Sequence, residues 1–231
     1  MDLPIFFIDN FSSADILTLG EDTSKHVVQV LRMKTRYKLQ LTDGFGNLLT
    51  AQILDEHTKR CTVKIVERQA IVRKQQELCV AISLLKTASR FEWFLEKATE
   101  IGVTEIIPLL CDRTEKQHFR YDRMMQILKS AMMQSKQVWL PVLHQPTALS
   151  GAINSSNYKV KLIAHCEKEI KTNIKDFGNQ SSVQILIGPE GDFSVNEIAY
   201  ALEKNFEPVA LGETRLRTET AGVVAATILC L

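Results

Sequence analysis

Hydrophobic and polar positions follow a short-strand pattern over the first third of the chain. Apolar residues alternate with polar ones between turn residues, which predicts strands at residues 5–8, 37–42, 48–54 and 61–67. Asp43 and Gly44 mark a tight turn between two of these strands. The spacing predicts a small antiparallel sheet or barrel in residues 1–70. Residues 71–77 are mostly polar and charged, and we expect a linker there.

The pattern changes from residue 78 onward, where apolar runs alternate with helical stretches. Residues 78–85 are almost continuously apolar, as is typical of a strand covered on both faces. Further strands are predicted at residues 105–110, 160–164, 183–187 and 208–211. Two helical stripes lie between these strands. The first comprises Phe91, Phe94, Leu95, Ala98 and Ile101 and ends at Gly102, and the second includes Met124, Leu128 and Met132. This alternation predicts an α/β domain over residues 78–231, with a mainly parallel sheet and helices on both faces.

Two segments near the end of the chain pass from an apolar strand through a glycine-containing loop into a helix. The first, residues 185–194, reads ILIGPEGDFS, and Ser194 with Glu197 forms a capping-box signature for the helix that follows. In open α/β sheets, ligands bind outside the carboxyl ends of the strands, where this loop must lie. A plain turn is the alternative interpretation, and the loop residues alone leave both open.

The second segment, residues 211–222, reads LGETRLRTETAG. Thr218 is the expected N-cap of the last helix, and Glu219 would fall in its first turn, where the helix dipole favours an acid. Arg215 and Arg217 precede it and favour contact with a phosphate or a substrate over a solvated pair. Neither segment contains a Walker or GxGxxG pattern, which disfavours a phosphate cradle and a dinucleotide-dependent oxidoreductase.

Composition adds constraints rather than a function. The net charge is +1, and the five cysteines are scattered without metal-ligand spacing, which argues against a disulfide framework and a metal site. The acidic, briefly apolar start of the chain does not resemble a signal peptide, and no run is long enough to span a bilayer, so we expect a soluble cytoplasmic protein. One local feature is basic: Lys25, Arg32, Lys34 and Arg36 lie in a stretch without acids. This strip is either an RNA contact or a protected strand edge.

The two C-terminal loops together resemble the SPOUT superfamily of S-adenosylmethionine-dependent RNA methyltransferases. More closely, the chain resembles the ribosomal RNA small-subunit methyltransferase E family, which methylates uracil N3 in 16S ribosomal RNA. The resemblance extends to residues 26–34 (HVVQVLRMK), 41–47 (LTDGFGN), 90–114 and 131–143. The chain departs from the family where it has Asp192 in place of a frequent glycine, and where Arg215 is displaced by one position. It also has Gln137 where a basic residue is common, and residues 35–36 replace a turn that often contains glycine.

The resemblance implies a C-terminal domain with a deep trefoil knot, a PUA-like N-terminal β-barrel that binds RNA, and a homodimer with the small ribosomal subunit as partner. It implies that S-adenosylmethionine binds against residues 188–192 and 211–217 and a third loop. The implied cofactor contacts are His165, Leu186, Gly188, Pro189, Glu190, Gly191, Leu211, Gly212 and Leu216. Arg217 and Arg215 would steady the uracil carbonyls or a phosphate, and either Glu219 or Glu190 would accept the N3 proton, the alternative for each acid being a purely structural role. The alternatives are a SPOUT enzyme for another RNA position and a non-catalytic ribosome-assembly protein.

Overall fold

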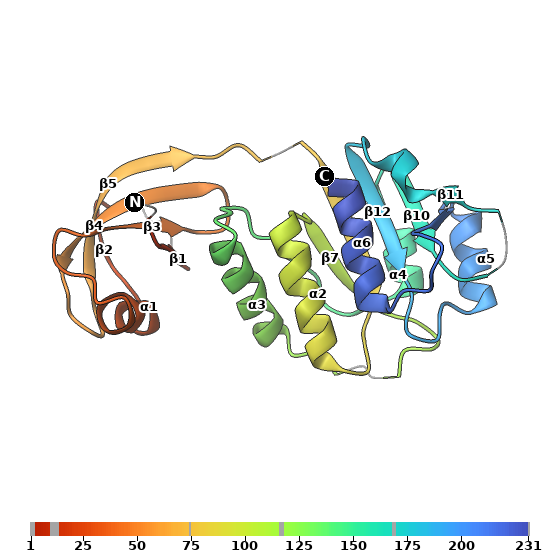
Figure 1. The fold of residues 1–231 in the computed structure, drawn as a ribbon, viewed down its shortest axis with the longest axis horizontal. Coiled ribbons are helices and arrows are strands. Elements are labelled where there is room, and N and C mark those ends of the chain that lie inside the picture. The colour runs from red at the N-terminus through yellow and green to blue at the C-terminus, as the bar shows by residue number, and fades with distance from the viewer. Residues whose placement is uncertain (1–2, 10–13, 74, 116–117, 168–169, 231) are drawn as a thin grey trace. The chain divides into compact units, whose positions relative to one another are not determined.

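The computed structural model describes residues 3–9, 14–73, 75–115, 118–167 and 170–230 (Figure 1). The chain forms two compact units: Met1–Arg73 with Met132–Leu140, and Lys74–Ala131 with Pro141–Leu231. The sequence pattern assigns residues 132–140 to the second domain, whereas the structure groups them with the first unit. Backbone hydrogen bonds explain the difference, because Gly46 N donates to Val138 O (2.8 Å) and Leu140 N donates to Gly44 O (2.9 Å).

The first unit is built on a five-stranded sheet with the order β1-β3-β4-β5-β2. Its strands are β1 (Ile5–Phe7), β2 (Ile16–Thr18), β3 (Lys38–Thr42), β4 (Asn47–Asp55) and β5 (Thr62–Ala70). The four predicted strands are present, and β2, none of whose three residues is buried, is an addition. The pairings are antiparallel as predicted except for β1, which pairs with β3 in parallel. Between β2 and β3, a short helix α1 (Glu21–Lys25) continues into a π-helix, η1 (His26–Val30), which the pattern did not predict.

The second unit is built on an eight-stranded, all-parallel sheet with the order β11-β13-β10-β12-β6-β7-β8, and β9 also pairs with β7. The five predicted strands are β6 (Glu77–Ser83), β7 (Glu105–Leu110), β10 (Val160–Ala164), β12 (Ser182–Ile187) and β13 (Glu207–Ala210). Three additional strands have two residues each: β8 (Val142–Leu143), β9 (Thr147–Ala148) and β11 (Thr172–Asn173). A two-residue strand has no period to detect.

Helices cover both faces of this parallel sheet, as predicted (Figure 1). They are α2 (Ala88–Ile101), α3 (Tyr121–Gln134), α4 (Leu149–Asn154), the 3-10 helix η2 (Ile174–Phe177), α5 (Val195–Glu203) and α6 (Thr218–Cys230). Ala81 of β6 packs in one core cluster with Leu149 of α4 and Ile198 of α5. Its neighbour Ile82 points to the other face, where it and Phe94 of α2 surround Gly222 of α6. This alternation explains why β6 reads as a continuous apolar run.

The neighbouring strands β13, β10 and β12 run in the same direction, so their carboxyl ends meet at one edge of the sheet. The segments that follow them therefore converge there. These are residues 165–167 with 170–171, residues 188–194 and residues 211–217.

Candidate functional site

A cavity of about 570 Å³ lies at the edge where β10, β12 and β13 end. Its walls come from the three converging segments and from the first turn of α6. Nine of the residues singled out in the sequence line it: His165, Gly188, Pro189, Glu190, Leu211, Gly212, Arg215, Leu216 and Arg217. Further lining residues include Cys166, Lys171, Asp192, Glu213 and Ala221. The structure thus brings both predicted loops, and the expected third loop with His165, around one space.

Three other candidate residues do not line this cavity in the described part of the chain. Leu186 is fully buried in β12, where it belongs to the core cluster beneath α4 and α5. Gly191 faces a separate hollow of about 360 Å³, which Arg113 also lines. Glu219 is only 6% exposed and points to α2, where its Oε1 atom lies 3.7 Å from Arg90 Nε.

Asp192 holds the first loop in a left-handed backbone conformation, with a φ of 65°. Its Oδ1 accepts a hydrogen bond from Phe193 N (2.8 Å), and its Oδ2 accepts one from Cys166 N (2.8 Å). Aspartate tolerates left-handed φ better than most residues because its short side chain can bond to nearby backbone in this way. The residue that replaces a frequent glycine therefore also ties the loop after β12 to the loop after β10.

The helix that follows begins as predicted. Ser194 is the N-cap of α5, and both hydrogen bonds of the capping box with Glu197 are present. Phe193 is buried below the loop, and a Cβ atom at Gly188 would lie 3.1 Å from its ring. Gly188 therefore allows the backbone to pack closely against the core at the point where the strand ends.

Arg113, which the sequence did not single out, fastens the same loop from outside. Its Nη1 donates to Gly191 O (2.7 Å) and to Phe193 O (3.3 Å). Its neighbour Asp112 accepts a hydrogen bond from the Ser194 hydroxyl (2.6 Å). Arg113 was missed because it follows a different strand, β7, and no local pattern marks a residue that bonds 78 positions away.

The second loop is exposed over most of its length, including Arg215 and Arg217. Thr218, which was expected to be the N-cap, is instead the first helical residue of α6. The carbonyl of Arg217 accepts the hydrogen bond from Ala221 N (2.8 Å), so Arg217 occupies the cap position. The start of α6 therefore fixes the backbone of an arginine that lines the cavity.

Charges of both signs surround the cavity. Glu190 and Asp192 contribute acids at the first loop and Glu213 contributes one at the second, while Lys171, Arg215 and Arg217 contribute cations. Burial, reinforced by the nearby Asp192 carboxylate, raises the pKa of the Cys166 thiol, and Arg215 opposes this shift. Such a space can hold a ligand that carries a cationic centre together with a group that develops negative charge.

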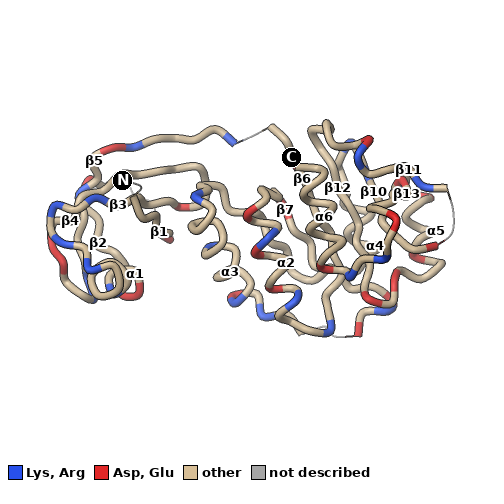
Figure 2. The backbone as a smooth tube through the Cα atoms, in the orientation of Figure 1, with Lys and Arg blue, Asp and Glu red and all other residues tan. Residues whose placement is uncertain are grey.

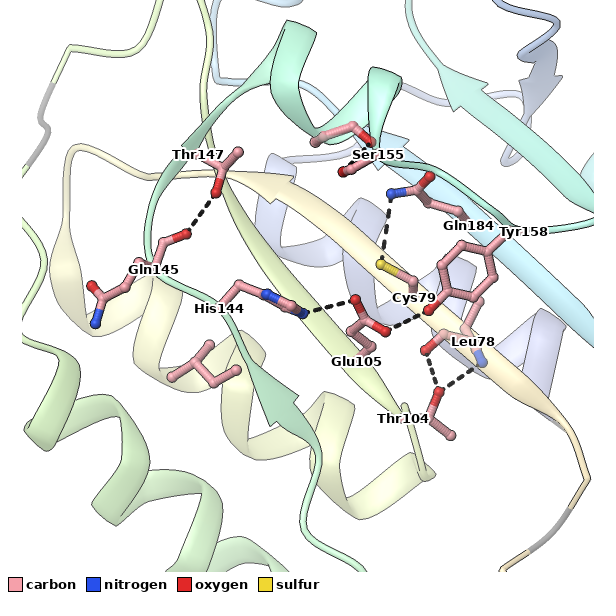
Figure 3. Close-up of polar contacts among 12 residues, drawn as sticks. Leu78, Cys79, Thr104, Glu105, His144, Gln145, Thr147, Ser155, Tyr158 and Gln184 are labelled. Carbon is pink, nitrogen blue, oxygen red and sulfur yellow. Dashed lines mark hydrogen bonds and ion pairs between the residues drawn. The ribbon is translucent and has the colours of Figure 1, made fainter.

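A second polar cluster lies at the amino end of β7, away from the cavity (Figure 3). The Glu105 carboxylate lies 2.8 Å from His144 Nε2 and accepts a hydrogen bond from the Tyr158 hydroxyl (2.5 Å). Burial, with the charge of Glu105, raises the pKa of Tyr158. The cluster ties β7 to the segments before α4 and β10. Within the described residues, no group of three or more His, Cys, Asp or Glu side chains could hold a metal ion.

The basic strip of the first unit is not a strand edge (Figure 2). Lys25 lies in α1, whereas Arg32, Lys34 and Arg36 lie in the connection to β3, and all four are exposed. The strip itself contains no acidic residue, but two of its cations form ion pairs with acids outside it. Lys25 pairs with Glu21 (2.9 Å), and Lys34 pairs with Glu56 (3.2 Å). Its charge is therefore partly neutralised. No helix in the described part of the chain has the length and apolar character needed to cross a membrane.

Comparisons with known proteins agree on one family. The family of RNA methyltransferase domains matches residues 72–230. The ribosomal RNA small subunit methyltransferase E of Mesomycoplasma hyopneumoniae (strain 232) is 33% identical over 162 residues, which span 66% of this chain and 69% of that protein. A crystal structure of a probable rRNA methyltransferase from Porphyromonas gingivalis is 35% identical, with a TM-score of 0.92 over 99% of this chain and 98% of its own. A ribosomal RNA small subunit methyltransferase E from Neisseria gonorrhoeae bound to S-adenosyl methionine is 26% identical, with a TM-score of 0.87 over 97% of this chain and 95% of its own.

Proposed function

The chain belongs to the ribosomal RNA small subunit methyltransferase E family of RNA methyltransferase domains, and from this premise we propose that it methylates 16S ribosomal RNA. The methyl group comes from S-adenosylmethionine, and the acceptor is N3 of one uridine in the small subunit. The observation that carries the proposal is the cavity of about 570 Å³, because nine residues named from the sequence line it together. The similar chain from Neisseria gonorrhoeae, which binds S-adenosyl methionine, supports the choice of cofactor.

The cavity fits the cofactor in size and in chemistry. Its volume lies within the range of about 300–1,000 Å³ that is common for small-ligand pockets. Leu211 and Leu216 offer apolar walls for an adenine ring, and the backbone of both loops offers N–H and C=O groups to read its edge. Glu190 and Asp192 suit a sulfonium. When bound, the cofactor supplies an electrophilic methyl group, whose bond to sulfur breaks as the bond to N3 forms.

The residues of this chain would orient the uracil and manage its proton. Methyl transfer depends on in-line geometry, and N3 lies on the Watson–Crick edge, so the base must be unpaired and held in place. Arg217, with Arg215, would bind the uracil carbonyls as negative charge develops on them. Of the two candidate proton acceptors, Glu190 lines the cavity, whereas Glu219 is turned toward Arg90. We therefore propose that Glu190 accepts the N3 proton of the uracil and that Glu219 has a positioning role.

The finer architecture also belongs to this proposal. Residues 1–70, with residues 132–140 added, would form a PUA-like barrel that binds RNA, residues 71–77 a linker, and the rest of residues 78–231 a SPOUT domain with a trefoil knot. Two chains would form a homodimer in the cytoplasm. The exposed strip of Lys25, Arg32, Lys34 and Arg36 supports RNA binding by the first unit, although the ion pairs of Lys25 and Lys34 reduce its effective charge.

The test is incubation with labelled S-adenosylmethionine and small subunits that lack the modification, followed by mapping of the methylated base. We expect label at N3 of a single uridine, and label at another position or in transfer RNA would refute the assignment. Arg217→Ala should slow transfer with little change in cofactor affinity, whereas Glu190→Gln should slow transfer and also weaken cofactor binding, because Glu190 lines the cavity beside the sulfonium. Glu203→Gln, at the exposed end of α5, is the matched control. Binding of the cofactor should be measured separately by calorimetry, because a non-catalytic assembly protein would fail both measurements.

A further inference from the structure

The first unit presents an exposed aromatic residue at the turn between β3 and β4. Phe45 is 74% exposed, which is unusual for a large apolar side chain on a defined turn. It forms an isolated antiparallel bridge with Trp139, from the segment that joins this unit late in the sequence. Residues directly opposite in such a bridge have Cβ atoms about 4.5–5.5 Å apart on the same face, so both rings belong to one surface.

The turn that carries Phe45 is held rigidly. The buried Asp43 carboxylate accepts hydrogen bonds from Phe45 N (2.8 Å) and from Asn47 Nδ2 (2.6 Å). Gly46 has a left-handed φ of 88°, and a Cβ atom there would lie 2.4 Å from the Trp139 ring. Because the turn and the tryptophan are interlocked, the Phe45 ring is presented without the entropy loss that ordering a flexible loop would require.

Positive charge lies beside these rings. The Arg73 guanidinium lies 5.4 Å from the centre of the Trp139 ring, in a cation–π arrangement, and the indole Nε1 donates to Ile71 O (3.0 Å). Val72, which lies between Ile71 and Arg73 in the sequence, is 89% exposed. Lys136, on the same segment as Trp139, is also exposed. We call Phe45, Val72, Arg73, Lys136 and Trp139 the Phe45 surface. It combines rigid aromatic and apolar groups with two cations.

We propose that the Phe45 surface binds single-stranded RNA, with an unpaired base stacked on Phe45 and the neighbouring phosphates near Arg73 and Lys136. Aromatic platforms next to cations are the usual means of holding unpaired nucleotides. A second copy of this chain fits less well, because a two-fold contact would place this patch against itself and bring like charges together. The choice of RNA as the partner rests on the proposed function. The surface is separate in sequence from the strip of Lys25 to Arg36.

The experiment uses Trp139 as its own reporter. The chain has two tryptophans, so a Trp93→Phe background leaves Trp139 as the only one. The full-length protein is titrated with a 12-nucleotide single-stranded RNA of mixed sequence, and the quenching of tryptophan emission gives the Kd. Phe45→Ala, Phe45→Leu and Phe45→Tyr are compared in this background. Ile16→Ala is the matched control, because Ile16 is an exposed apolar residue on β2 of the same unit.

We expect Phe45→Ala and Phe45→Leu to weaken RNA binding about fivefold or more, which is the low end of what one stacked base contributes. Phe45→Tyr should retain the affinity because the ring remains, and Ile16→Ala should leave it unchanged. RNA affinity that is unchanged in Phe45→Ala, or retained in Phe45→Leu, overturns the proposal. A change of oligomeric state in Phe45→Ala, measured by sedimentation, overturns it in favour of a contact between copies.

Failure here is distinguishable from failure of the proposed function, because the two have different readouts. Calorimetry with S-adenosylmethionine should give the same affinity for wild type and Phe45→Ala. If wild type methylates the small subunit while Phe45→Ala binds RNA normally, only the Phe45 surface is wrong. If wild type neither binds the cofactor nor transfers the methyl group while Phe45→Ala loses RNA affinity, only the proposed function is wrong.

Discussion

Replacing Arg113 with alanine should weaken the binding of S-adenosylmethionine without removing any atom that lines the cavity. Arg113 donates to Gly191 O at 2.7 Å and to Phe193 O at 3.3 Å, and so fastens the outside of the loop whose inner face forms the cavity wall. The truncation releases both carbonyls to water. The loop can then leave the conformation that fits the cofactor.

The size of the effect follows from these contacts. A hydrogen bond to a charged group contributes about 1.5–3 kcal/mol when it is well formed, but exposure to solvent reduces this strongly. Arg113 is exposed, and one of its two bonds is long. We therefore expect about 1–2 kcal/mol of lost loop stabilisation in all. The apparent affinity falls in proportion to the fraction of molecules whose loop is in the binding conformation. If the whole loss appears in that fraction, the Kd should rise about 5- to 30-fold.

Isothermal titration calorimetry with the cofactor alone measures this quantity without RNA. Arg113→Lys keeps the charge but loses the planar fork, so its affinity should fall between those of wild type and Arg113→Ala. Arg123→Ala is the control, because Arg123 is likewise an exposed arginine and its partner is Glu92 on α2 rather than the loop. An unchanged Kd in Arg113→Ala, with full stability in thermal unfolding, would refute the reasoning. It would mean that the capping box and the hydrogen bonds of Asp192 and Asp112 hold the loop without Arg113.

Three further tests concern the packing and the loops. Gly222→Ala should destabilise the fold by about 1–3 kcal/mol in urea unfolding. Alanine favours helix, but its Cβ atom would lie 2.7 Å from Phe94 Cε2. Stability at or above that of wild type would contradict this packing. Asp192→Ala should be less stable than Asp192→Gly by about 1 kcal/mol. Both variants lose the side-chain hydrogen bonds, but only alanine is strained by the left-handed backbone conformation. Equal melting temperatures would argue against this strain. Cys166 is exposed and lines the cavity, so S-adenosylmethionine should protect it from maleimide; without cofactor, labelling at neutral pH should be slower than that of a free cysteine, because its raised pKa leaves less thiolate. Equal labelling with and without cofactor would place the ligand elsewhere.

Local patterns predicted the fold where the elements are long enough to have a period. The strand β6 and its neighbour β12 lie between helices on both faces, and a continuous apolar run is what such burial requires. The two-residue strands escaped because their place is set by partners distant in sequence. The same holds for residues 132–140, whose assignment to the first unit depends on hydrogen bonds to the turn at Gly44 and Gly46.

Departures from the family pattern gain a physical meaning only from the backbone. Asp192 stands where glycine is frequent and Arg36 belongs to a turn that often contains glycine, and both have left-handed φ values, of 65° and 75°. Glycine adopts such angles freely, whereas other residues need support. Asp192 finds it in its own hydrogen bonds, and the carbonyl of Arg36 accepts one from Gln52 Nε2 (3.1 Å). The sequence could identify the substitutions but not these compensations.

The carboxylate of Glu219 illustrates how position in the fold decides between two chemical roles that the sequence leaves open. The residue belongs to the first turn of α6, next to Thr218, which does line the cavity. Its side chain is 8% exposed and is directed to Arg90 of α2, at 3.7 Å. A general base must come within hydrogen-bonding distance of the proton that it accepts, and a buried group outside the cavity wall does not meet that condition. What Glu219 can do is join α6 to α2, and this fixes the start of the helix whose first carbonyl belongs to Arg217. We therefore propose that Glu219 acts on the reaction only by fixing the backbone of Arg217.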